Sequence, residues 1–104
     1  MARYQVLSWH GIPVQVRARE GRQRVSVELP KRFMEAVDKA AMASKSVDGE
    51  SYTEGFQWGP REQRDGSAEE VANVVAAELD AQYTEIDHRA VALRLREERK
   101  QQDE

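Results

Sequence analysis

Cysteine is absent from this chain of 104 residues. Disulfide bonds, thiolate nucleophiles, iron–sulfur clusters held by cysteine and cysteine-type zinc sites are therefore excluded. No apolar run approaches the roughly 20 residues that a membrane-spanning helix needs. The N-terminus also lacks the charged, apolar and small-residue pattern of a secretory signal. These absences predict a cytoplasmic protein with no membrane partner, and the length suits a single folded domain.

The chain also has no excess of positive charge. Its 16 Lys and Arg residues are outnumbered by 19 Asp and Glu residues, which gives a net charge of -3. General affinity for nucleic acids comes largely from Lys and Arg that neutralise phosphates, so general nucleic-acid binding is not expected.

Residues for metal or acid–base chemistry are few. The two histidines, His10 and His88, lie far apart in the sequence and offer no ligand spacing for a metal. Glu54 is the one acid beside an aromatic cluster and is a weak candidate for a catalytic carboxylate. There is no Gly-rich phosphate loop and no nucleophile elbow. We therefore predict no catalytic residues, no metal site and no cofactor.

Two alternating runs predict a hairpin near the N-terminus. Val14, Val16 and Ala18 alternate with polar residues, and so do Val25, Val27 and Leu29, as expected for half-buried strands. Gly21 lies between the two runs and tolerates a turn with positive φ. An earlier strand, from Tyr4 to Trp9, is bulky on both faces. The three segments together predict an antiparallel β-meander.

Helical spacing follows Pro30. Phe33, Val37 and Ala40 recur on one face of a predicted helix from Lys31 to Ala43. A second helix begins after Ser67, where Ser67 and Glu70 have the spacing of a capping box. It carries an apolar stripe that ends near Tyr83.

Tyr52 to Trp58 is predicted to be a fourth strand, with Phe56 and Trp58 on one face. Gly55 in its middle indicates a bulge or the close approach of another backbone. Large aromatic residues in a small domain are most often core, and we expect this of Trp9, Phe56 and Trp58. The alternative for Trp58 is a contact with a partner, since Trp is enriched in protein interfaces.

The C-terminal segment is predicted to be a third helix from His88 to about Lys100, with Asp87 as its N-cap. A short strand is the alternative, because Val91, Leu93 and Leu95 also alternate with other residues. In a helix, Val91 and Leu95 share a face whereas Leu93 points nearly opposite. We expect these three residues to contact another chain, either a larger protein or a second copy.

The predicted fold class is thus α+β: an antiparallel β-meander and a fourth strand, packed by two helices. The domain spans residues 1–83. Residues 84–104 form a C-terminal helical extension that ends in a polar tail from Gln101 to Glu104.

Arginines are concentrated in the first third of the chain. Arg17 and Arg19 share the polar face of one predicted strand, and Arg24 can lie across from them, so these three arginines form a candidate anion-binding patch. Single-stranded RNA surfaces also need aromatic residues for stacking, and the neighbouring positions hold Gln15 and Ser26 instead. A solvated sheet face is the alternative interpretation.

Three stretches carry a family resemblance. They are YQVLSWHGIPVQV, LPKRFMEAVDKAAM, and Tyr52 with EGFQWGPREQRDGSAEEVANVVAAELDAQY. Residues 2–83 resemble a family of small bacterial proteins labelled "virulence factor", whose domain also closes a larger protein called conserved virulence factor C.

The resemblance implies no catalytic residues. It also implies that relatives are encoded beside genes for tetrahydrofolate and corrinoid methyl-group metabolism. The resemblance therefore implies an accessory subunit or partner of a one-carbon enzyme. We therefore predict a non-catalytic interaction module that supports a larger cytoplasmic protein. The alternatives are an anion or nucleic-acid binding domain that uses the Arg-rich sheet face, and a small enzyme that uses Glu54 or His10.

Overall fold

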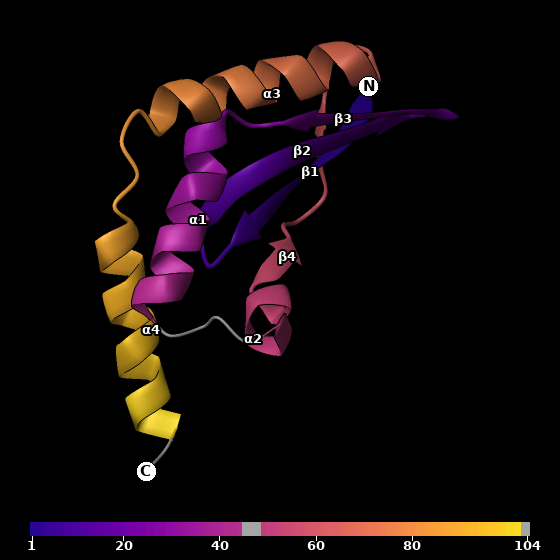
Figure 1. Cartoon of the computed structure of the whole chain (residues 1–104). Coiled ribbons are helices and arrows are strands. Elements are labelled where there is room, and N and C mark those ends of the chain that lie inside the picture. The colour runs from indigo at the N-terminus through magenta and orange to yellow at the C-terminus, as the bar shows by residue number, and fades with distance from the viewer. Residues whose placement is uncertain (45–48, 103–104) are drawn as a thin grey trace.

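The computed structural model describes residues 1–44 and 49–102, which form an α+β fold (Figure 1). This confirms the predicted fold class. In chain order the elements are β1 (Ala2–Trp9), β2 (Ile12–Glu20), β3 (Gln23–Glu28), α1 (Lys31–Ala43), α2 (Gly49–Glu54), β4 (Phe56–Trp58), β5 (Glu62–Arg64), α3 (Ala68–Gln82) and α4 (His88–Gln102).

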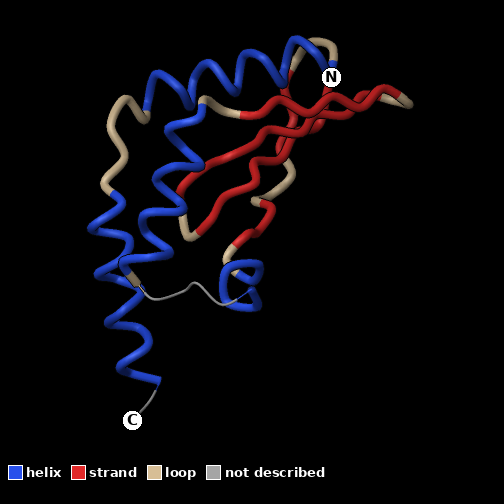
Figure 2. The backbone as a smooth tube through the Cα atoms, in the orientation of Figure 1, coloured by secondary structure: helices blue, strands red, loops and turns tan. Residues whose placement is uncertain are grey.

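The sheet is antiparallel, with strand order β3-β2-β1-β4, and β5 also pairs with β1 (Figure 2). β4 and β5 pair with successive halves of β1. Pro60 lies between them and has no N–H to donate, which interrupts the pairing. The backbone N–H of Gly59 still donates to the Val6 carbonyl at 2.8 Å. The short strand β5 is absent from the sequence prediction, because Glu62–Arg64 has no apolar alternation to indicate it.

One face of the sheet forms the core. Val16 and Ala18 of β2 point toward it and are fully buried, as the period of two predicts. Phe33 and Val37 of α1 and Val71 of α3 belong to the same buried cluster. The two helices therefore cover one face of the sheet. On the other face, β2 exposes Arg17 and Arg19.

The predicted strand from Tyr52 to Trp58 is wrong in its first half, because Tyr52 lies within the short helix α2, which ends at Glu54, and only Phe56–Trp58 is extended. The fully buried Trp9 is the reason. Its Nε1 donates to the Tyr52 carbonyl at 2.9 Å, and the ring of Tyr52 lies 5.3 Å from that of Phe56. α2 therefore packs over the end of β1. The close approach expected at Gly55 is present, but a side chain makes it: a Cβ at Gly55 would lie 2.2 Å from Trp9 Nε1.

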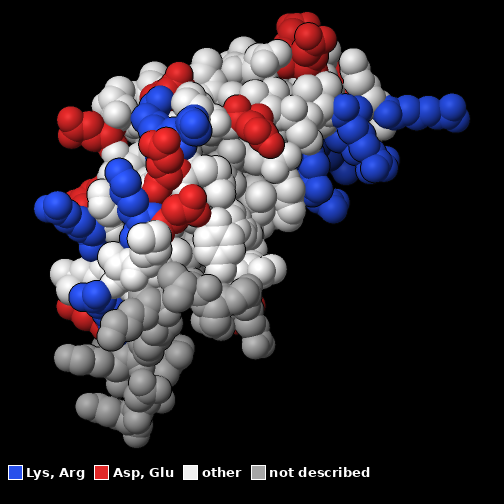
Figure 3. Space-filling view, in the orientation of Figure 1, with Lys and Arg blue, Asp and Glu red and all other residues white. Residues whose placement is uncertain are grey.

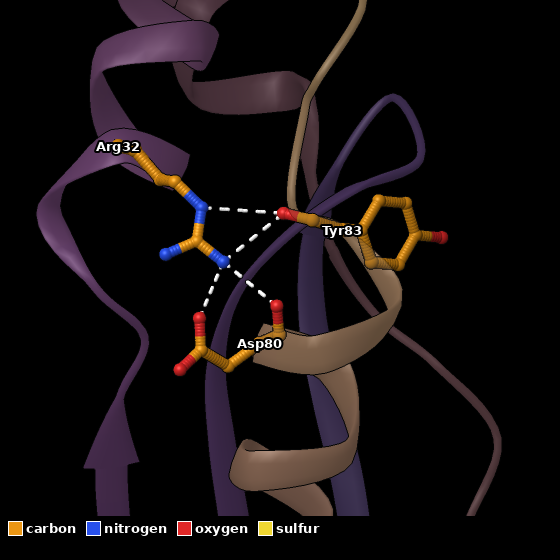
Figure 4. A network of polar contacts seen from close by, with 3 residues as sticks. All are labelled: Arg32, Asp80 and Tyr83. Carbon is orange, nitrogen blue, oxygen red and sulfur yellow. Dashed lines mark hydrogen bonds and ion pairs between the residues drawn. The ribbon is translucent and has the colours of Figure 1, made fainter.

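The helix ends follow the sequence closely. The Glu70 N–H donates to the Ser67 hydroxyl at 3.2 Å, which confirms the predicted cap of α3. At the other end of α3, the Arg32 guanidinium donates to the carbonyls of Asp80 and Tyr83 and pairs with the Asp80 carboxylate (Figure 4). Since the last carbonyls of a helix have no partner within it, Arg32 satisfies them and ties α1 to α3.

α4 is a helix, as predicted, and the alternative of a short strand is wrong. The Ala90 N–H donates to the Asp87 carboxylate at 3.0 Å, so Asp87 is the N-cap. α4 runs beside α1 (Figure 1). Gln101 and Gln102 belong to the helix rather than to a tail, and residues 103–104 lie outside the described ranges. Within the described ranges, no helix combines the length and apolar character needed to cross a membrane.

Candidate functional site

The candidate site is the sheet face that α1 and α3 leave uncovered, here called the open face. The strand register arranges its residues in rows, since paired residues share a face. The first row is Gln63, Arg3, Arg19 and Arg24; the second is Gln5, Arg17 and Ser26; the third is Trp58, Leu7, Gln15 and Glu28. The open face thus brings together Arg17, Arg19, Arg24 and Trp58.

The first row places arginines directly opposite one another. Arg19 pairs with Arg3 on β1 and with Arg24 on β3, so three guanidinium groups extend from adjacent strands. Strands lie about 4.8 Å apart, which keeps these like charges close. None of the three pairs with a carboxylate among residues 1–44 and 49–102. The row is therefore a concentrated, uncompensated positive charge.

Trp58 is held on the open face by the second row. The guanidinium carbon of Arg17 lies 4.0 Å from the centroid of the Trp58 ring, within the range of a cation–π contact. Arg17 Nη2 also donates to Gln5 Oε1 at 2.8 Å, and Gln5 Nε2 donates to the Gly59 carbonyl at 3.0 Å. This chain of contacts fixes both the indole and the arginine before any ligand arrives.

A concavity of about 580 Å³ opens at the first row. Its lining includes five arginines, namely Arg3, Arg17, Arg19, Arg24 and Arg61, and one carboxylate, Glu20. In the view of Figure 3, basic side chains gather around the end of the sheet where β2 turns into β3. Arg61 follows the Gly59-Pro60 break between β4 and β5. Sequence reasoning missed it, because only the pairing of β5 with β1 brings residue 61 to this face.

The chemistry of the concavity favours binding over proton transfer. Guanidinium groups stay protonated in proteins and cannot act as general acids or bases. Tyr4 also borders the concavity, but it pairs with the buried Ala18 on the core side of the sheet, and its hydroxyl donates to the Glu62 carboxylate at 2.6 Å. This hydrogen bond, together with burial, raises the pKa of the Tyr4 hydroxyl above its ordinary value. Tyr4 therefore remains neutral at physiological pH.

The prediction that Trp58 belongs to the core is wrong, since 37% of its surface is exposed. Trp9 is fully buried, as predicted, and Phe56 is half-buried. Trp58 pairs with Leu7 and Phe56 pairs with Trp9. Trp58 therefore lies over the uncovered middle of β1, whereas Phe56 lies at the end that α2 covers. The sequence could not reveal this difference.

The weaker catalytic candidates lie outside the open face. Glu54 is exposed at the end of α2, and His88 lies in the first turn of α4. His10 occupies the turn between β1 and β2 with a φ of 46°, and its backbone carbonyl accepts a hydrogen bond of 2.6 Å from Arg94. Burial, and then repulsion by Arg94, lower the pKa of His10. In the part of the chain that the structure describes, no three His, Asp or Glu residues gather as metal ligands would.

The residues predicted on α4 are divided between two environments. Val91 and Leu95 are half-buried and pack against the core, and Ala92 between them is only 3% exposed. Leu93 points away from the domain and is 59% exposed. The structure thus uses Val91 and Leu95 within the chain and leaves Leu93 for solvent or a partner.

Comparison with known proteins identifies the family of this chain. The profile of the family described as "Virulence factor" matches residues 7–91, which include all of β2 to α3 and the start of α4. No curated protein and no solved structure has significant similarity to the chain. The match covers most of the sequence, so the chain belongs to the virulence factor family.

Proposed function

We propose that this chain is a non-catalytic interaction module that binds a larger protein through its open face. The observation that carries the proposal is the partly exposed Trp58 ring, which reaches from the edge strand β4 to stack on Arg17 of β2 at 4.0 Å on the open face. Trp and Arg are the residues most often responsible for binding energy in protein interfaces. A ring that its neighbours already orient loses little conformational freedom on binding, which favours affinity.

The charge of the open face defines the partner. The arginines around the concavity outnumber Glu20 and Glu28, so a partner surface rich in Asp and Glu would be complementary. Such complementarity accelerates association and selects among partners. It also disfavours a second copy of this chain on the same face, because two Arg-rich surfaces repel each other.

The identity of the partner rests on the family resemblance alone. That resemblance supports a bacterial cytoplasmic enzyme of tetrahydrofolate or corrinoid one-carbon metabolism, with this chain as an accessory subunit. The open face adds a requirement to this proposal: the enzyme should present an acidic surface.

The exposed Leu93 on α4 is a second candidate for contact with the partner. Val91 and Leu95 can join such an interface only at their exposed edges, because both already pack against the core of this chain. The division into a domain of residues 1–83 and an extension of residues 84–104 remains a prediction. It is tested by whether residues 1–83 fold without α4.

The proposal is tested with Trp58→Ala and Arg17→Glu, and with Lys39→Glu on the exposed side of α1 as a control that has the same charge change as Arg17→Glu. A stoichiometric complex is purified from the native host and reconstituted from its separate components. We expect each open-face variant to weaken the reconstituted complex at least about tenfold, as the loss of an interface hot spot does. The control should change it less than about threefold.

Two results would contradict the proposal. The first is that no stoichiometric complex forms with any protein. The second is that the complex survives both open-face variants but is lost in Leu93→Asp, in which case α4 is the docking surface. A homo-oligomer seen by light scattering and lost in Leu93→Asp would instead identify a second copy as the occupant of α4.

Anion binding is the second candidate function, and the row of Arg3, Arg19 and Arg24 favours it. General nucleic-acid binding is not expected, since the net charge is -3 and Trp58 is the one large aromatic exposed on the described open face. Fluorescence anisotropy with mixed single-stranded and duplex oligonucleotides at physiological salt tests this. Sub-micromolar binding that Arg17→Ala with Arg19→Ala removes would overturn the expectation.

A further inference from the structure

The register of the sheet creates an unfavourable charge arrangement in the free protein. Arg19 lies directly opposite Arg3 on one side and Arg24 on the other. Like charges in opposed positions of neighbouring strands destabilise a sheet. Backbone pairing fixes the positions of the three Cα atoms, so the side chains can only splay apart; they cannot leave the row.

Among the described residues no carboxylate pairs with this row, although Arg19 Nε donates to the Gly21 carbonyl at 3.3 Å. Other arginines do pair with carboxylates. Arg32 pairs with Asp80, and Arg64 lies 2.8 Å from Glu78. Glu20 is the one carboxylate near the row, and it lies 3.8 Å from the N-terminal ammonium group instead of a guanidinium group. The fold therefore leaves these particular arginines available to an external anion.

The size and charge of the concavity indicate the ligand. Its volume of about 580 Å³ exceeds what one inorganic ion fills and lies within the range of small-molecule sites. Its lining has five arginines against one carboxylate. One phosphate group carries a charge of about -1.5 to -2 at neutral pH, so two phosphate groups match the excess. Guanidinium groups bind phosphate oxygens in a bidentate manner and stay charged at all physiological pH values.

We propose that the concavity binds a small molecule with two phosphate groups, a diphosphate or a bisphosphate, across Arg3, Arg19 and Arg24. Arg17 and Arg61, which also line the concavity, contact the rest of the ligand. The inference rests on the second candidate function above and names its ligand. A bound ligand also removes the repulsion within the row, so binding stabilises the fold more than the new contacts alone would.

Inorganic pyrophosphate is the probe, titrated into the full chain by calorimetry at about 0.15 M ionic strength. Arg19→Gln removes the centre of the row. Arg22→Gln, in the turn between β2 and β3 and outside the concavity, is the matched control with the same loss of charge. We expect Arg19→Gln to weaken binding at least about tenfold, which corresponds to one lost charge-assisted hydrogen-bond pair. Arg22→Gln should weaken it less than about threefold.

Thermal unfolding gives a second test, in which Arg19→Gln should raise the Tm of the free protein but reduce the increase in Tm that pyrophosphate produces. Without ligand, Arg19→Gln should unfold about 2–5 °C above the parent protein, because the cross-strand repulsion is gone. With pyrophosphate, the parent protein should gain the larger increase in Tm. A variant that has simply lost structure cannot show the first of these effects, so the assay separates a damaged fold from a damaged site.

Three outcomes would overturn the inference. The first is that pyrophosphate binds no more tightly than sulfate at equal ionic strength. The second is that Arg19→Gln and Arg22→Gln weaken pyrophosphate binding equally, which would indicate diffuse charge. The third is that only oligonucleotides or Glu-rich peptides bind. Failure of the protein-docking proposal is distinguishable from all three, because Trp58→Ala should weaken the protein complex at least about tenfold but pyrophosphate binding less than about threefold, since Trp58 does not line the concavity.

Discussion

Gly55→Ala should be one of the most damaging single-methyl changes in this protein. A Cβ at Gly55 would lie 2.2 Å from Nε1, 2.7 Å from Cδ1 and 2.8 Å from Cε2 of Trp9. Trp9 is fully buried and its Nε1 donates to the Tyr52 carbonyl, so its ring has no space into which to retreat. The new methyl group must therefore displace either the indole or the end of α2.

The cost follows from these two consequences. Overpacking a core typically costs 1–3 kcal/mol. A buried N–H that loses its acceptor costs roughly another 1–3 kcal/mol. We expect the free energy of unfolding to fall by about 3–5 kcal/mol, and Tm to fall by at least about 12 °C for a domain of this size.

Gly59→Ala is the matched control, since it makes the same change four residues later. There the nearest atom to a new Cβ is the Val6 carbonyl oxygen at 3.4 Å, an ordinary contact. The control should cost less than about 1 kcal/mol. Urea melts followed by far-UV circular dichroism measure both variants. If Gly55→Ala costs no more than Gly59→Ala, the close approach to Trp9 is not a feature of the folded protein and our account of α2 fails.

Three further predictions follow from the same contacts. Trp58→Ala should lower the free energy of unfolding by about 1 kcal/mol or less in urea melts, because the ring is 37% exposed, whereas Trp9→Ala should lower it by about 3–5 kcal/mol. Equal losses would show that Trp58 belongs to the core. Arg32→Ala should lower the free energy of unfolding by about 2 kcal/mol and Asp80→Asn by clearly less, because Arg32 also donates to two backbone carbonyls at the end of α3. Equal losses would mean that only the ion pair contributes to stability. The folded state lowers the pKa of His10 through burial and Arg94, with Glu98 opposing, so the unfolded chain binds more protons below about pH 6.5. Stability should therefore fall on acidification through that pH, and less so in His10→Asn, which tolerates the positive φ; parallel pH profiles would refute this cause.

Local sequence patterns predicted most of the secondary structure. The alternation in β2 and β3, the turn at Gly21 and the helix from Lys31 to Ala43 are all found where the sequence places them. The caps at Ser67 and Asp87 are also correct. Each of these features depends on residues within a few positions of one another, so the sequence alone contains the information.

The failures have a different origin. Tyr52 is helical because the buried indole N–H of Trp9 donates a hydrogen bond to its carbonyl, and Trp9 lies 43 residues earlier in the chain. β5 exists because β1 offers it an edge, since its own residues have no strand pattern. Both are cases in which a distant partner overrides or supplies what the local sequence does not specify.

The candidate site divides in the same way. The sequence by itself determined that this is a small acidic α+β domain without cysteine chemistry, with arginines on the polar face of β2. Only the tertiary structure decided that Arg3, Arg19 and Arg24 stand in one row, that Arg61 joins them, and that Trp58 lies exposed against Arg17. The physical reason is that these residues belong to different strands. Strand register, which backbone hydrogen bonds and the buried face set together, determines which side chains meet across a sheet.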